Sequence, residues 1–188
     1  RKQRLILYKA MVRSLFQHCA EVWRPALPTA LGKFEAVQKR AVKWIFMEDY
    51  HHYSDAVYKN KLRELDLLPI EQRFVLGDLI LFHKVINNEV YIDLPDYLEL
   101  IDPRELSTEP SNEPSEHRRL RTTHKDPLYF VCKIDDRVNV FRHSFFYRSH
   151  NLWNRLPLSM RLIADGTQFA EELRKHLAKS NLPDPEPD

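Results

Sequence analysis

Apolar residues recur at helical spacing along most of this chain. In residues 3–22 they lie three or four positions apart, so they fall on one face of a single predicted helix. These positions are Leu5, Tyr8, Val12, Leu15, Cys19 and Val22. Pro25 and Pro28 end this segment, and Thr29 is a suitable N-cap for a second helix. The apolar stripe of that helix is Phe34, Val37, Ala41 and Ile45.

Two more helices are predicted before residue 90. The third runs from Ser54, a suitable N-cap, to about Leu65. Its apolar positions are Val57, Leu62 and Leu65. Pro69 opens the fourth, over residues 70–86, whose apolar side chains cover most of its circumference. We therefore expect the fourth helix to be buried on more than one side, at the centre of the fold.

The pattern changes after residue 100. Residues 102–116 are acidic, rich in proline and nearly free of large apolar groups, which predicts a mobile linker. Residues 128–131 and 138–141 are short β-rich runs, with Asp135 and Asp136 near the turn between them, and we expect them to pair as a hairpin. Two amphipathic helices should follow, at 144–156, ended by Pro157, and at 168–178.

These patterns predict a mainly α-helical fold with one short β-hairpin. The scarcity of glycine, with only three residues, agrees with this class, because tight turns, phosphate-cradling loops and β-sandwiches depend on glycine. Five segments are expected: basic helices at 1–48, a helical core at 49–101, a linker and basic arm at 102–127, the hairpin and C-terminal helices at 128–179, and a disordered tail at 180–188.

The composition indicates a folded protein with reduced cysteines and without a membrane-spanning segment. A length of 188 residues with 43% hydrophobic content is enough for a folded core. The two cysteines are far apart, which predicts reduced thiols inside a cell, and Cys19 should be a core thiol. The longest apolar stretch, 74–82, is too short for a membrane span. The chain begins with Arg1 and not with methionine, so we expect a piece of a longer polypeptide.

Charge is segregated along the sequence. Residues 1–47 hold ten Lys or Arg against two acids, residues 48–116 hold six against sixteen, and residues 117–155 hold nine against three. Two basic blocks that flank an acidic one suggest a polyanion partner, because Lys and Arg that neutralise phosphates release counterions. The alternative is that basic and acidic segments face each other inside the fold.

Three groups of basic residues are candidates for phosphate contact. One forms a stripe beside the apolar face of the first helix, and one lies opposite the apolar stripe of the second helix. The third lies in the run His-Arg-Arg-Leu-Arg-Thr-Thr-His-Lys at 117–125, which is alternatively a nuclear localisation signal or a solvated loop that neutralises the linker. The candidates are Lys2, Lys9 and Arg13; Lys33, Lys39, Arg40 and Lys43; and Arg118, Arg119 and Arg121.

No self-contained active site is predicted. The Asp135–Asp136 pair is similar to the paired aspartates that hold Mg²⁺ in polymerases. In polymerases an aromatic residue lies two positions before the pair, whereas here this residue is Lys133, whose positive charge would repel the metal ions. The histidines and cysteines lack the two short-spaced pairs of a zinc site. A Gly-x-Ser-x-Gly nucleophile elbow is also missing from the sequence.

Three blocks of sequence resemble one family. The strings Leu-Tyr-Lys-Ala-Met-Val-Arg-Ser and Val-Gln-Lys-Arg-Ala are similar to the segment that follows the catalytic palm in jockey-like non-LTR (LINE-type) retrotransposon reverse transcriptases. Leu-Arg-Glu-Leu-Asp-Leu-Leu-Pro-Ile-Glu-Gln-Arg-Phe resembles the next block of that family, and Asn-Leu-Trp-Asn-x-Leu-Pro resembles its C-terminal signature. The signature positions are Trp23, Gln38, Arg73, Asp78, Asn151, Leu152, Trp153, Asn154, Leu156 and Pro157.

The resemblance implies a thumb and post-thumb region without catalytic residues. The polymerase aspartates and the endonuclease of the family lie upstream, so this chain itself should hold no cofactor, whereas the parent polymerase would use Mg²⁺. Its implied partners are template RNA, cDNA or target DNA and the upstream polymerase domain, in the nucleus and cytoplasm. The alternative is a structural or protein-interaction domain that packs on the polymerase core or recruits a host protein. Trp23, Trp44 and Trp153 are either anchors of such an interface or, as we expect, core residues.

Overall fold

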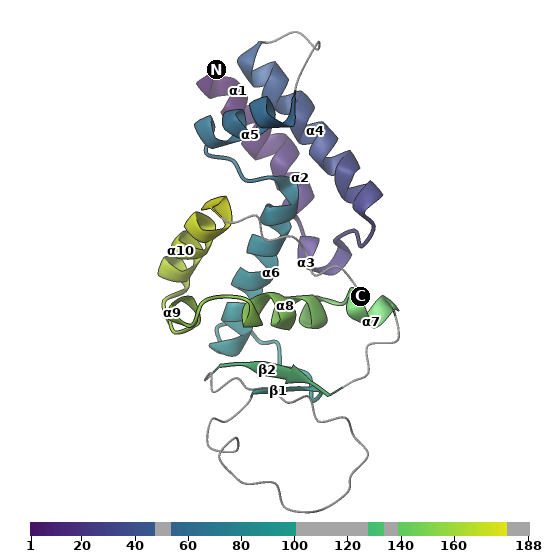
Figure 1. Cartoon of the computed structure of the whole chain (residues 1–188), viewed down its shortest axis with the longest axis vertical. Helices are drawn as coiled ribbons and strands as arrows, with labels where there is room; N and C mark the ends of the chain where they lie inside the picture. Colours follow the sequence, from purple (N-terminus) through teal and green to yellow (C-terminus); the bar gives the residue numbers. More distant parts are fainter. Residues whose placement is uncertain (48–53, 101–127, 134–138, 180–188) are drawn as a thin grey trace, which may run out of the picture.

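The computed structural model describes residues 1–47, 54–100, 128–133 and 139–179. It is mainly helical with one small antiparallel sheet, which confirms the predicted fold class. The long helix α6 (Ile70–Ile86) lies at the centre, and α3, α4, α8 and α10 all contact it (Figure 1). The linker, the Asp135–Asp136 pair, the basic arm and the tail lie outside the described residues.

The N-terminal helix is shorter than its pattern predicts. The continuous run consists of α1 (Lys2–Leu7), the π-helical segment η1 (Tyr8–Arg13) and α2 (Ser14–Gln17). His18 is extended and Cys19 adopts a left-handed conformation with a φ of 53°, so the short helix α3 (Ala20–Trp23) starts in a new direction. The Nε1 group of Trp23 donates to the His18 carbonyl over 2.6 Å, which ties the turn together. As a result Leu15, Cys19 and Val22 are exposed, and the interpretation of Cys19 as a core thiol is wrong.

Helices α4 (Pro28–Phe46) and α5 (Asp55–Glu64) pack on the N-terminal run. Pro28, and not Thr29, opens α4 because its fixed φ suits the first helical position. The interior side of α4 presents Gln38, Val42 and Ile45, whereas Val37 faces outward. Ser54 caps α5 as predicted, with its Oγ accepting from the Val57 amide over 3.4 Å. Tyr58 rather than Val57 fills the interior there.

Helix α6 begins directly after Pro69, as predicted, and is buried on two sides. Near its start, Phe74 joins an aromatic cluster with Trp23 and Phe34, at ring-centroid distances of 5.8 and 6.2 Å. Trp23 keeps 38% of its surface exposed and is therefore less central to the core than predicted. Farther along α6, Leu79 and Phe82 belong to a second apolar cluster with the C-terminal helices. The helix thus connects two cores.

The two-stranded sheet pairs segments that are distant in sequence. Strand β1 (Leu98–Leu100) runs antiparallel to β2 (Phe130–Cys132), with Leu98 opposite Cys132 and Leu100 opposite Phe130. The predicted hairpin partner of β2 is wrong, because residues Asn139–Arg142 form the short helix α7. A run of β-prone residues gives only a weak local preference, and tertiary pairing decides which strand it joins.

Residues of the C-terminal signature connect the last helices of the chain to this sheet. The helices are α8 (Phe145–Asn154), α9 (Leu158–Arg161) and α10 (Gly166–Lys179). The Asn154 amide donates to the Phe130 carbonyl over 2.8 Å and accepts from its amide over 3.0 Å, so it satisfies the free edge of β2 as another strand would. Trp153 is 1% exposed and donates from Nε1 to the Leu128 carbonyl over 3.0 Å. Leu152 and Leu156 are buried in the same cluster.

A buried charge network ties the two halves of the chain together. The Asp78 carboxylate in α6 accepts from Arg24, just after α3, over 2.8 Å and from Arg148 in α8 over 3.2 Å. Arg148 also donates to the Glu21 carbonyl over 3.0 Å and to the His143 carbonyl. The side chains of Asp78 and Arg24 are each 1% exposed. Such a network is satisfied only when α3, α6 and α8 are all in place.

Stability should fall as the pH drops below about 6.5, in part because of His150. This residue in α8 is 5% exposed, and burial lowers the pKa of its imidazole below the ordinary value of 6.5. In that range the unfolded chain binds a proton that the folded chain does not, so protonation favours unfolding. Urea midpoints measured from pH 7.5 to 5 should decline less for His150→Asn than for the native protein. Parallel declines would contradict this assignment.

Candidate nucleic-acid interface

The outer side of α4 carries the best-exposed basic residues among those predicted to bind phosphate. Lys33 and Arg40 are exposed and lie, by helical rotation, opposite the buried Gln38 and Val42. Neither has an ion-pair partner among the residues that the structure describes. Lys43 lies on the same side but is half-buried and has contacts within the protein. We refer to Lys33, Arg40 and Lys43 as the α4 basic face.

The only acidic residue of α4 is turned away from this face. Glu35 accepts the Tyr58 hydroxyl and, over 2.8 Å, the Ile70 amide at the start of α6. Burial and the Glu35 carboxylate raise the pKa of Tyr58, so the phenol keeps the proton that it donates. Gln38 completes the network by donating to the Tyr58 oxygen over 3.1 Å and accepting from the Tyr8 hydroxyl over 2.6 Å. No carboxylate of α4 therefore neutralises its outer side.

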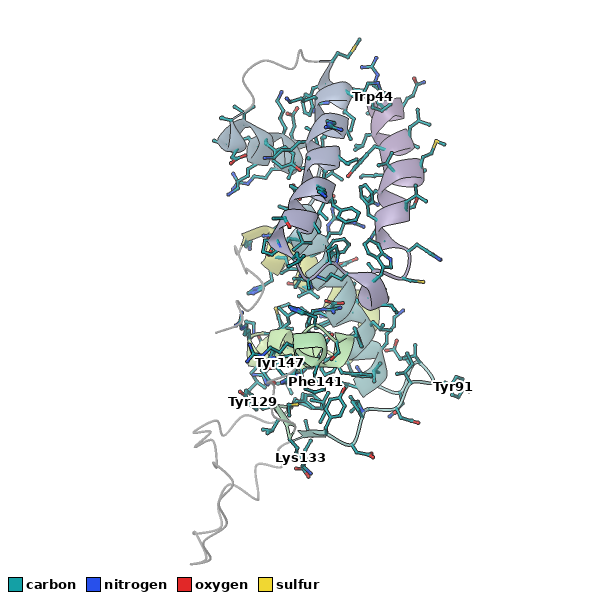
Figure 2. All side chains as sticks on the ribbon, turned by 90° about the vertical axis from the view of Figure 1, so that its right-hand side faces the viewer. Trp44, Tyr91, Tyr129, Lys133, Phe141 and Tyr147 are labelled. Atoms are coloured by element: carbon teal, nitrogen blue, oxygen red, sulfur yellow. The ribbon has the colours of Figure 1, made fainter. Side chains whose placement is uncertain are left out.

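An exposed tryptophan adjoins the basic face. Trp44 is 46% exposed and lies on α4 beside α1 (Figure 2). The Arg4 guanidinium donates to the Trp44 carbonyl over 2.9 Å and lies 5.4 Å from the ring centroid. The expectation that Trp44 is a core residue is therefore wrong. A cation next to an exposed aromatic ring is a common means of contacting nucleotide bases and phosphates.

The other candidates are dispersed. Lys2 is exposed near the N-terminus, and Lys39 forms an ion pair with Asp55 over 2.8 Å. Lys9 and Arg13 are half-buried, so they do not form the open basic edge that was predicted. Arg118, Arg119 and Arg121 lie outside the described residues.

Two basic residues that the sequence did not mark as binding residues lie near these groups. Arg4 joins the α4 surface through Trp44, and the signature residue Arg73 lies close enough to Arg13 for their charges to interact. Helical spacing places Arg4 away from the stripe of Lys2, Lys9 and Arg13, so only the packing of α1 on α4 identifies it. The resemblance marked Arg73 as a signature position without giving it a role.

The described residues give no sign of a metal centre or a membrane span. No group of three or more His, Cys, Asp or Glu side chains lies close enough to hold a metal ion within 1–47, 54–100, 128–133 and 139–179. In the same ranges no helix is both long and apolar enough to cross a bilayer.

No family model, curated protein or solved structure matches this chain.

Proposed function

We propose that this chain is the non-catalytic C-terminal part of a non-LTR retrotransposon reverse transcriptase and helps to hold template RNA, cDNA or target DNA. The sequence blocks that resemble this family support the proposal. The observation that carries it is the α4 basic face: Lys33 and Arg40 are exposed, whereas Glu35, the one acid of the helix, is used in the interior. A helix surface on which Lys33 and Arg40 have no ion-pair partner among the described residues, beside an exposed Trp44, suits a phosphate backbone.

Replacing Lys33, Arg40 and Lys43 together by glutamate should weaken binding to RNA/DNA hybrid by at least about tenfold and lower the log–log salt slope by about two, because up to three phosphate contacts are lost. The effect should be similar for every sequence tested. Fluorescence anisotropy at several salt concentrations measures both quantities.

A matched control changes the same number of charges elsewhere. Lys84, Arg155 and Lys179 are exposed on α6, after α8 and on α10, and their triple replacement by glutamate alters net charge equally. The control variant should retain most of the affinity. Equal losses in the two variants would show that only net charge matters and would reject the α4 basic face as the interface.

The exposed apolar side of the first helix favours a second candidate function, a protein-interaction domain. Leu7, Met11 and Leu15 follow one another at four-residue spacing and are 49%, 65% and 71% exposed, and exposed apolar residues on one side of a helix are typical of an interaction surface. In this case α1 and α2 would pack on the polymerase core or on a host protein. This function predicts little nucleic-acid binding by the chain alone and no effect of the α4 substitutions.

A further inference from the structure

Two arginines on neighbouring helices have buried donors without a partner. The Nε atoms of Arg13, at the end of η1, and of Arg73, in the first turns of α6, are shielded from solvent and make no hydrogen bond. Neither side chain forms an ion pair with a carboxylate in the described part of the chain. Both side chains are half-buried, but buried polar atoms in native proteins are nearly always hydrogen-bonded, so the two unpartnered Nε atoms call for a physical explanation.

The surroundings of these arginines contain an excess of positive charge. Lys9 and Arg174 lie near enough to interact with them, and the one carboxylate of the group, Asp66, is paired with Arg174 over 2.6 Å. Burial, and after it the charge of Arg13, lowers the pKa of Arg73 to about 10. Burial is also the main cause that lowers the pKa of Arg13. Among the described residues, Asp66 is therefore the one carboxylate whose charge acts on Lys9, Arg13 or Arg174.

The arginines that are buried in the described residues all have hydrogen-bond partners, and Arg161 donates to the Leu156 and Leu128 carbonyls. Arg24 and Arg148 both donate to Asp78, and Arg148 donates to two backbone carbonyls as well. The Arg13 and Arg73 pair lacks every such partner among the described residues. The contrast indicates that the pair is not a structural ion-pair network like the one around Asp78.

The backbone near these arginines has an unusual conformation. Arg13 and Lys9 lie in η1, a π-helical segment within an otherwise α-helical run. Such segments are rare and frequently occur at functional sites. Arg174 and Asp66 line a groove of about 510 Å³ between the α5–α6 turn and α10, whose other charged residues are Lys59, Arg63, Lys175 and Glu171. Arg174 belongs both to this groove and to the group of cations whose charges act on Arg13 and Arg73.

We propose that Arg13 and Arg73, assisted by Lys9 and Arg174, bind a phosphate-type oxyanion, either a backbone phosphate of a nucleic acid or a free phosphate. Guanidinium groups present several donors in a fixed plane, and two of them from adjacent helices can hold a tetrahedral oxyanion through charge-assisted hydrogen bonds. The ligand supplies the negative charge that the cluster lacks. This site is separate from the α4 basic face and does not depend on the function proposed for it.

The first test uses inorganic phosphate as the probe and the full 188-residue chain. Phosphate should raise the melting temperature of the native protein saturably, and by more than sodium chloride at the same ionic strength. Arg13→Met and Arg73→Met should each weaken the phosphate response by at least about tenfold, because each removes charge-assisted hydrogen bonds. Arg155→Met, at an exposed position just after α8, is the matched control and should respond like the native protein. A native response equal to that of chloride, or an unchanged response of Arg73→Met, would overturn the proposal.

The second test separates binding from a structural role. In buffer without phosphate, Arg73→Met should unfold at the same urea concentration as the native protein or at a higher one, because a half-buried cation with an unpartnered Nε is removed while the apolar stem is kept. Unfolding at a clearly lower concentration would mean that the guanidinium stabilises the fold, which contradicts the proposal.

A third test distinguishes the two sources of the oxyanion. If a nucleic-acid phosphate occupies the site, Arg73→Met should weaken binding of labelled single-stranded RNA, and phosphate at constant ionic strength should compete with the RNA. If the ligand is a free phosphate, Arg73→Met should lose the phosphate response but bind RNA like the native protein. The proposal for the α4 basic face can fail independently of this site. In that case the triple glutamate variant would bind RNA as tightly as the native protein does, while the native protein would still respond to phosphate.

Discussion

Replacing Asp78 by asparagine should lower the free energy of unfolding by about 3–5 kcal/mol, the cost typical of removing one partner from a buried ion pair. Asparagine keeps the size of the side chain, so the loss reports charge and hydrogen bonding and not a cavity. Arg24 and Arg148, with side chains 1% and 9% exposed, would be left without their counter-ion. Urea denaturation followed by circular dichroism measures the change.

An exposed ion pair provides the control for Asp78. Glu99 and Lys133 approach to 2.9 Å at side-chain exposures of 60% and 54%, and pairs of this kind contribute about 0–1 kcal/mol. Glu99→Gln should therefore change stability little. If Asp78→Asn were equally mild, the network would not be what connects α3, α6 and α8.

Trp153→Ala should cost about 3–5 kcal/mol of stability, as is usual for deleting a large buried aromatic side chain. Its ring lies 5.7 Å from both Phe82 and Phe169, and its Nε1 hydrogen bond to Leu128 would be lost too. The substitution leaves a cavity where α6, α8 and α10 meet. The shift of the urea midpoint, combined with the slope of the transition, gives the cost.

Trp44→Ala is the matched comparison for Trp153. Because Trp44 is 46% exposed, its removal should change stability by less than about 1 kcal/mol. Comparing the stability lost in the two variants tests whether Trp153 lies in the core and Trp44 at the surface. A greater loss from Trp44→Ala would contradict the described packing.

Local signals in the sequence identified the central and C-terminal helices. Pro69 and the apolar run after it predicted α6 over 70–86, and Ser54 predicted the start of α5, because caps and periodicity act over a few residues. The break at Cys19 was missed, since a left-handed residue other than glycine has no reliable local signal. The partner of β2 was missed because β1 lies about thirty residues earlier, and strand pairing is settled by tertiary contacts.

The candidate interface was only partly predictable. The distribution of charges predicted that residues 1–47 are basic. The helical spacing predicted that Lys33, Arg40 and Lys43 lie on the outer side of α4. Rotation alone could not show that Glu35 turns inward to bind Ile70, which leaves that side without an acid. The burial of the Arg13 and Arg73 Nε atoms could not be predicted either, because it depends on tertiary packing. Gln38 was marked only by the resemblance, since periodicity assigned the interior position to its neighbour Val37.

The most direct test of the proposed function is an anisotropy titration of the full chain with a labelled RNA/DNA primer-template, single-stranded RNA and duplex DNA, each at several salt concentrations. The account predicts submicromolar binding to the hybrid and an affinity that falls steeply as salt rises, because phosphate contacts dominate. No binding at low salt, by a chain whose cooperative urea unfolding shows that it is folded, would contradict it and favour the protein-interaction function.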